Sequence, residues 1–156
     1  MLELPTTLQE FLDLHFQFIE SYTEGRVHVY TSPDLRLRIV HDRNGKFFMD
    51  VSVKEHPTKD PADWIIFGDL RSYMLNDDDY LTGNATFDEI STFFIDRYNT
   101  ILDLLKNSYS VTKNALEERG YKRAEVLFGY KRPESKTEAE KKNSDDQKQK
   151  KPWWRL

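Results

Sequence analysis

The stretch from Asp34 to Lys54 decides the fold of this chain, and it reads DLRLRIVHDRNGKFFMDVSVK. Two runs that alternate apolar and polar residues flank Asn44-Gly45, a pattern typical of a β-hairpin. A two-residue loop at Asn44-Gly45 sets Leu37 against Ser52 and so mixes apolar and polar residues on one face. We therefore predict a three-residue loop, Arg43 to Gly45, with the glycine in the left-handed conformation.

This longer loop gives the hairpin one apolar face and one charged face. On the first face it pairs apolar and ring-bearing residues: His41 with Phe47, Ile39 with Met49, Leu37 with Val51 and Leu35 with Val53. On the second face Arg38 lies against Asp50. Further from the loop, Asp34 lies against Lys54. Opposite charges at cross-strand positions contribute about 0.2–1 kcal/mol each, so two independent patterns favour the same register.

The residues before the hairpin predict a helix that begins at a capping box. In Thr7-Leu-Gln-Glu10 the threonine hydroxyl and the glutamate each satisfy a free amide at a helix start. Gly25 is placed to end the helix in the left-handed conformation. Residues that recur at helical spacing fill the interval: Leu8, Phe11, Leu12, His15, Ile19 and Tyr22, with Leu14, Phe16 and Phe18 widening the stripe so that the helix is covered on more than one side.

Residues 26–31 predict a third strand, which joins the hairpin through the turn Ser32-Pro33-Asp34. Val27 and Val29 alternate there with polar and aromatic residues. If the valines join the apolar face of the sheet, the opposite face carries Arg26, His28, Tyr30, Arg36 and Arg38.

The second half of the chain predicts helices. Asp60-Pro-Ala-Asp63 offers an N-cap followed by proline, so we expect a helix over residues 61–75, with a short strand at residues 64–67 as the alternative. Thr86-Phe-Asp-Glu89 is a second capping box, from which a helix runs to about Asn107. A further helix begins at about Ser110, with Gly120 as its expected break.

The predicted fold class is α+β: an N-terminal helix, a three-stranded antiparallel meander, then two or three helices packed on one sheet face. We expect one domain over residues 1–130. Residues 131–151 hold no aliphatic residue larger than alanine and are dense in charged and polar residues. Such a segment cannot offset its ordering entropy, so residues 131–156 are expected to form a disordered tail that ends in an aromatic motif.

Composition places the protein in a broad class. The chain has no cysteine, which removes disulfides and thiolate chemistry and suits a reducing compartment. The N-terminus lacks the basic region and apolar core of a signal peptide, and no run approaches the roughly 18 apolar residues of a membrane span. We therefore expect a soluble cytoplasmic protein that does not bind membranes.

Charge is unevenly distributed along the chain. The net charge is −4, but residues 1–105 carry 19 acidic and 9 basic residues, giving −10, while residues 106–156 carry 8 and 14, giving +6. An acidic body repels nucleic acid and prefers a basic partner if it binds by charge. Nucleic-acid binding is therefore not expected, although Tyr30 and nearby arginines would share a sheet face.

No cofactor, metal site or catalytic site is predicted. The four histidines, His15, His28, His41 and His56, lack the spacing of a metal motif. Asp77-Asp78-Asp79 lacks the spacing of a calcium loop and is interpreted as a solvated acidic loop. The chain has only 6 glycines and contains no nucleophile elbow, P-loop or dinucleotide fingerprint, so we do not expect an enzyme.

The leading hypothesis is a non-catalytic module that binds a basic protein, as an inhibitor or an adaptor. The expected contact residues are Asp60, Asp63, Asp77, Asp78, Asp79 and Asp88. A second hypothesis assigns function to the tail, in which Trp153, Trp154 and Arg155 tether the domain to a larger assembly, because aromatic and arginine anchors dominate binding hot spots. A third is a small enzyme or ligand-binding domain with a pocket between sheet and helices.

In size, acidity, lack of cysteine and helix-then-meander layout, residues 1–130 resemble the small immunity and inhibitor proteins of bacterial toxin systems. The resemblance is one of architecture, and fold by itself does not fix function.

Overall fold

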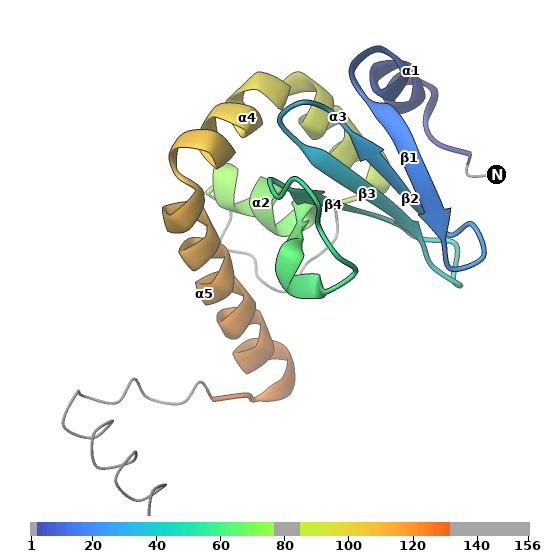
Figure 1. Cartoon of the computed structure of the whole chain (residues 1–156). Helices are drawn as coiled ribbons and strands as arrows, with labels where there is room; N and C mark the ends of the chain where they lie inside the picture. The colour runs from blue at the N-terminus through green and yellow to red at the C-terminus, as the bar shows by residue number, and fades with distance from the viewer. Residues whose placement is uncertain (1–2, 77–84, 132–156) are drawn as a thin grey trace, which may run out of the picture.

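The computed structural model describes residues 3–76 and 85–131. The fold is α+β, as predicted, with an N-terminal helix, an antiparallel sheet and then further helices (Figure 1). The sheet has five strands in the order β1-β2-β3-β4-β5. The elements are α1 (Thr6–His15), β1 (Gln17–Tyr22), β2 (Val27–Thr31), β3 (Arg36–His41), β4 (Phe47–Ser52), η1 (Pro61–Asp63), β5 (Ile65–Ile66), α2 (Phe67–Met74), α3 (Phe87–Asp96), α4 (Tyr98–Asn107) and α5 (Tyr109–Phe128).

The central hairpin, β3 and β4, has the predicted register. His41 pairs with Phe47, Ile39 with Met49, Leu37 with Val51 and Arg38 with Asp50. Gly45 has a φ of 80°, and the Asp42 N–H donates to the Lys46 carbonyl at 2.8 Å across the loop. The alternating pattern and the glycine together therefore set this part of the sheet.

The predictions that Asp34 pairs with Lys54 and that Leu35 pairs with Val53 are wrong. The ladder ends at the pair Arg36 and Ser52, so residues 34–35 and 53–54 lie beyond it. Asp34 instead forms an ion pair with Lys106 of α4 at 2.7 Å, and Lys54 forms one with Asp63. The residues before β3 and the residues after β4 turn towards different elements, so Asp34 and Lys54 do not lie opposite each other.

The predicted number of strands, three, is too low, because the sheet has one additional strand at each edge, β1 and β5. The first addition, β1, lies where the helix from Thr7 was expected to continue towards Gly25. Residues 16–22 are rich in aromatic and β-branched side chains, which favour a strand when a neighbouring strand is available. Helix α1 therefore ends at His15. Gly25, with a φ of 78°, belongs to the β1–β2 turn.

Two details of the predicted first helix are also wrong. Thr7 does not cap it, since α1 begins at Thr6 and Pro5 occupies the N-cap without a side-chain hydrogen bond. Leu14 is 80% exposed, and Phe16 and Phe18 lie beyond the end of α1, so these residues do not widen its buried stripe to a second side. The buried stripe is narrow and holds Leu8 and Leu12.

The valines of β2 lie on the face opposite to the one we considered. Val29 pairs with Arg38, whereas Tyr30 pairs with Leu37 and His28 pairs with Ile39. Directly paired residues share a face, so the valines lie with the arginines, and Tyr30 joins the main core. A register change of one residue reverses every side chain of a strand, and the β2–β3 turn leaves that choice open in the sequence.

The segment expected to be a helix over residues 61–75 divides into three elements, and the alternative of a short strand is confirmed in part. Asp60 caps the 3₁₀ turn η1 by accepting from the Ala62 N–H at 2.9 Å. The two residues of β5 then pair with β4, Ile65 with Val51 and Ile66 with Asp50. Helix α2 follows at once.

The remaining helices are confirmed with changed limits. Thr86 caps α3 by accepting from the Glu89 N–H at 3.2 Å, as the capping box predicts. The predicted helix to Asn107 is interrupted at Arg97, where φ is −109° and ψ 14°, giving α3 and α4. Gly120 does not break α5, which ends at Gly129 in the left-handed conformation.

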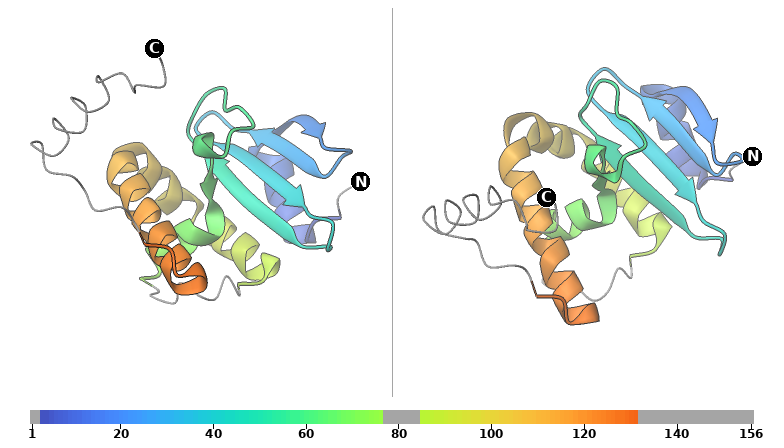
Figure 2. Two further views of the ribbon diagram at one scale, coloured as in Figure 1. Left: turned by 90° about the horizontal axis from the view of Figure 1, so that it is seen from below. Right: turned by 60° about the horizontal axis from the view of Figure 1, so that its bottom comes forward.

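The main core lies between one face of the sheet and helices α1 to α4. Figures 1 and 2 show the strands as one twisted layer with α1, α3 and α4 on the same side of it. Burial of each large apolar side chain stabilises the fold by about 1.5–3 kcal/mol. The fully or almost fully buried apolar residues of this core are Leu8, Leu12, Leu35, Leu37, Ile39, Met49, Val51, Phe67, Leu70, Phe94, Ile101 and Leu105.

Candidate protein-binding surfaces

The second face of the sheet carries a cluster of charged and aromatic side chains. Arg38 donates two hydrogen bonds to one oxygen of Asp50, at 2.9 and 2.7 Å, and its guanidinium lies 4.4 Å from the Trp64 ring centroid. Burial raises the pKa of Asp50, and the hydrogen bonds and charge of Arg38 oppose that rise. Lys59 lies 4.3 Å from the centroid of the Tyr22 ring. Most of this cluster's charge is therefore satisfied within the chain.

The loop between β4 and β5 closes over this cluster, and the predicted contact residue Asp63 holds it in place. Both carboxylate oxygens of Asp63 accept bonds: one from Lys54, the other from the N–H and hydroxyl of Thr58 at 2.8 and 2.6 Å. These contacts lower the pKa of Asp63 well below its usual range, Lys54 having the largest effect. The Trp64 indole N–H donates to the Thr58 carbonyl at 2.7 Å, which fixes the end of the loop.

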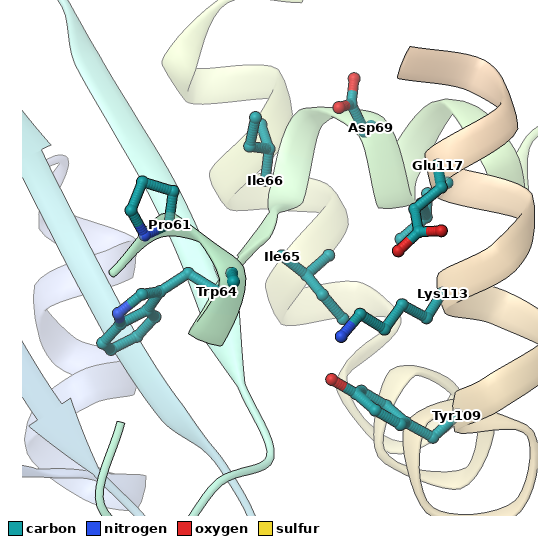
Figure 3. A pocket seen from close by; sticks show the side chains of 10 residues that line it. Pro61, Trp64, Ile65, Ile66, Asp69, Tyr109, Lys113 and Glu117 are labelled. Atoms are coloured by element: carbon teal, nitrogen blue, oxygen red, sulfur yellow. The ribbon is translucent and has the colours of Figure 1, made fainter. Parts of the chain in front are cut away.

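A groove of about 220 Å³ separates β5 and η1 from the start of α5 (Figure 3). Pro61 and Ile65 line one wall, and Tyr109, Lys113 and Glu117 project from successive turns of α5 on the other. Pockets that enclose a small ligand usually have about 300–1,000 Å³ and bury most of the ligand. This open groove is smaller, so it gives little support to the hypothesis of a ligand-binding domain.

The groove also contains an ion pair that fixes its far end. Asp69 of α2 accepts from both terminal nitrogens of Arg123 in α5, one of them at 3.3 Å. A second hollow, of about 540 Å³, is lined by Glu117, Gly120, Tyr121, Ala124 and Tyr130. Its lining comes from α5 and the residue after Gly129, so it has a single wall and encloses nothing.

A surface without lysine or arginine lies on residues 3–25, which form the segment before α1, α1 itself, β1 and the turn that follows. Residues 1–25 contain five acidic residues and no lysine or arginine. All five are exposed, and none of them takes part in the ion pairs found within residues 3–76 and 85–131. We call this surface the acidic edge; its residues are Glu3, Glu10, Asp13, Glu20 and Glu24.

The acidic edge also exposes apolar side chains. Phe18 and Ile19 of β1 are each 50% exposed, and Leu14 of α1 is more exposed still. Phe18 contacts His28 and Tyr30 of β2 at centroid distances of 5.5 and 5.7 Å, which fixes the Phe18 ring at the rim of the sheet. Exposed apolar and acidic side chains therefore occur on the same two elements, α1 and β1.

The predicted contact residues that the structure describes are Asp60, Asp63 and Asp88, and they lie at two elements, η1 and α3. Asp60 and Asp63 flank η1, whereas Asp88 is exposed in the first turn of α3. Glu89, next to Asp88, lies 4.0 Å from Arg71. The other predicted contact residues lie outside the described residues: Asp77, Asp78, Asp79, Trp153, Trp154 and Arg155.

The histidines belong to separate parts of the fold. His15 and His41 each lie 4.5 Å, centroid to centroid, from a phenylalanine ring, Phe11 and Phe47 respectively. Among the described residues no group of three or more His, Cys, Asp or Glu side chains is arranged to hold a metal ion. His28 bonds to the Gly25 carbonyl at 3.1 Å and so supports the β1–β2 turn.

The acidic edge was not found by sequence reasoning, although a simple signal was present. A charge count over residues 1–105 averages this segment with later residues that contain nine bases. A count over residues 1–25 alone reveals that no base is present. The structural meaning of the count required β1, because a helix over the same residues would pair its own backbone groups, whereas β1 places Glu20 on an edge strand of the sheet.

Comparison of the chain with family models, with curated proteins and with solved structures found no match. Within the described residues no helix combines the length and the apolar character that a membrane crossing requires.

Proposed function

We propose that this chain is a non-catalytic binding module for a basic protein, which it inhibits or links to other components. The observation that carries the proposal is the acidic edge, where five exposed carboxylates lie on adjoining elements without a compensating base in residues 1–25. Complementary charge raises the rate of encounter with a partner and excludes partners of the same sign.

The contacts of Asp63 and Asp69 favour placing the partner at the acidic edge and not at these two acids. Asp63 is held by Lys54 and Thr58, and Asp69 is held by Arg123, so their charges are largely neutralised within the chain. Carboxylates that already have a partner add little to the long-range field that a basic protein meets. Asp88 and the aspartates at positions 77–79 remain predicted contributors.

The experiment that tests the proposal compares two variants of equal net charge. The first neutralises four acids of the acidic edge: Glu10→Gln, Asp13→Asn, Glu20→Gln and Glu24→Gln. The matched control neutralises four exposed acids elsewhere: Glu55→Gln, Asp96→Asn, Asp103→Asn and Glu125→Gln. The native chain is first used to isolate a binding protein from the lysate of its host, and association of that purified protein with each variant is then timed.

We expect the isolated protein to be basic and its association with the native chain to slow about tenfold or more as salt rises. The variant of the acidic edge should bind slowly even at low salt, whereas the control should resemble the native chain. An acidic partner, or equal slowing by both variants, would contradict the proposal.

A second candidate function is tethering through the tail, and the end of α5 favours it. Val126 is 55% and Phe128 82% exposed, and Tyr130 follows them. Exposed apolar side chains often mark interaction sites. These side chains lie directly before the tail that carries Trp153 and Trp154. Deletion of residues 131–156 should leave the melting temperature unchanged and abolish capture of the larger assembly; capture that survives the deletion would exclude this function.

A further inference from the structure

Strand β1 forms one edge of the sheet, and among the described residues no strand pairs with its outer side. Five of its six residues are exposed, and only Tyr22 is partly buried. The opposite edge, β5, has two residues. An edge strand presents a row of unpaired N–H and C=O groups, so β1 is the longer of the two positions at which another strand could be added.

Proteins usually protect such an edge with lysine, proline, short strands or bulges. Gln17–Tyr22 contains no lysine and no proline, and its one protective feature is the register shift between Phe18 and Glu20. A bulge increases local twist and opposes the flat pairing of two identical strands. Pairing of two copies through β1 would also bring two acidic edges together, where like charges repel. A second copy is therefore a poor occupant.

Charge and exposed apolar groups define a better occupant. Glu20 lies on β1 itself, Asp13 lies on α1 before it, and Glu24 lies in the turn after it. The cations close to β1 and its turn are Arg38 and Lys59, both at Tyr22, and Arg26, whose N–H donates to the Thr23 carbonyl; Arg38 is paired with Asp50. The exposed halves of Phe18 and Ile19 offer apolar contacts to a neighbouring strand.

We propose that β1 accepts an extended segment of a protein partner, in which lysine or arginine alternates with apolar residues, as a sixth strand of the sheet. In this mode main-chain hydrogen bonds supply affinity and alternate side chains supply specificity. This inference rests on the proposed function and specifies its surface and partner chemistry.

The test uses the full-length chain and synthetic peptides of about eight residues, a usual strand length. The parent peptide alternates Val and Lys. Two further peptides carry N-methyl groups on all the valines or on all the lysines, which removes the N–H donors of one edge of the strand and keeps the charge. A fourth peptide alternates Val and Glu. Binding is measured by NMR, together with the exchange of the β1 amides.

We expect roughly half of the amides of residues 17–22 to exchange quickly in the free chain and to become protected when the parent peptide binds. One of the two N-methylated peptides should lose binding and the other should keep it, since a strand uses one edge for each neighbour. The Val–Glu peptide should not bind. Glu20→Gln should weaken the parent peptide about 2- to 5-fold at low salt, and Asp103→Asn should not.

Other outcomes would overturn the inference in distinct ways. If both N-methylated peptides bind as tightly as the parent, strand addition is wrong, while binding of a basic partner by charge still stands. Protection of the β1 amides in the free chain would mean that the edge is already occupied. A parent peptide that fails to bind at about 1 mM would exclude this edge as a site for basic strands, and the isolation of a partner would then test the proposed function separately.

Discussion

Arg38 and Asp50 face each other across the two central strands, and the guanidinium donates through Nε and Nη2 to the same carboxylate oxygen. The side chains are only 14% and 12% exposed. Both members of an ion pair buried to this extent must be present, because either one alone would be a poorly solvated charge without a partner. The pair also supports Trp64, which stacks on the guanidinium.

Replacement of Asp50 by asparagine should therefore lower the free energy of unfolding by about 2 kcal/mol, since it leaves the guanidinium without an anion. Urea denaturation of Asp50→Asn, Arg38→Gln and the double variant provides the measurement. The two losses should not add, with a coupling of about 1 kcal/mol between the sites. Additive losses would show that the two side chains contribute independently.

Asp63 should make stability depend on acid. Its pKa is lowered in the folded chain, chiefly by Lys54 and then by Thr58, so its carboxylate stabilises the fold above the unfolded pKa of about 3.9. That contribution is lost as pH falls through the lowered folded pKa. The difference in unfolding free energy between the native chain and Asp63→Asn should be constant above about pH 5 and should shrink below about pH 4.

The control for this prediction is Lys54→Met, which removes the largest cause of the lowered pKa and should reduce the acid dependence in part. Urea denaturation at a series of pH values measures it. A difference between the native chain and Asp63→Asn that stays the same down to pH 3 would contradict the assignment.

Trp64 should be a main determinant of the loop that covers the second sheet face. It is 8% exposed, and its indole N–H donates to the Thr58 carbonyl at 2.7 Å. Trp64→Phe keeps much of the buried area and should lower the free energy of unfolding by about 1 kcal/mol through the lost hydrogen bond. Trp64→Ala should lower it by about 3 kcal/mol or more. Circular dichroism in urea measures both losses. Equal losses for the two substitutions would show that the hydrogen bond and the buried area of Trp64 do not contribute separately.

Two glycines should respond in opposite directions to alanine. Gly45 has a φ of 80° in the hairpin loop, so Gly45→Ala should lower the free energy of unfolding by about 1–2 kcal/mol. Gly120 lies inside α5, and a Cβ there meets nothing within 4 Å. Gly120→Ala should raise stability by about 0.5–1 kcal/mol. Thermal melts of both variants make the comparison, and a stabilised Gly45→Ala would be inconsistent with the loop.

The β1–β2 turn contains two non-glycine residues in the left-handed region, Thr23 at a φ of 53° and Glu24 at 57°. A β-branched residue adopts that conformation at a cost of about 1–2 kcal/mol, and asparagine tolerates it better. Thr23→Asn should therefore raise the melting temperature. The helical substitution Thr92→Asn serves as the control and should have little effect. An unchanged melting temperature for Thr23→Asn would show that the turn is unstrained.

The candidate site was much less predictable than the fold. The acids singled out in the sequence include Asp63 and Asp60, which the structure uses to hold the loop and to cap η1. The placement of Glu20 at an edge of the sheet depends on β1 being a strand, and the sequence pattern assigned Ile19 and Tyr22 to a helix. Their spacing of three residues fits both a helix turn and, with a bulge, a strand.

The sequence by itself determined the β3–β4 register, the Thr86 cap and the Asp60 cap. Each cap depends on residues two or three positions apart, and the register depends on one short loop and the alternating runs on either side of it. Only the tertiary structure decided that Gln17–Tyr22 pairs with β2, and that Val29 lies beside Arg38. A short apolar run fits both the helical and the strand periodicity. Whether it forms a helix or a strand is therefore decided by the neighbouring element that completes its hydrogen bonds and buries its side chains. The same neighbours also determine which acids are paired and which face the solvent.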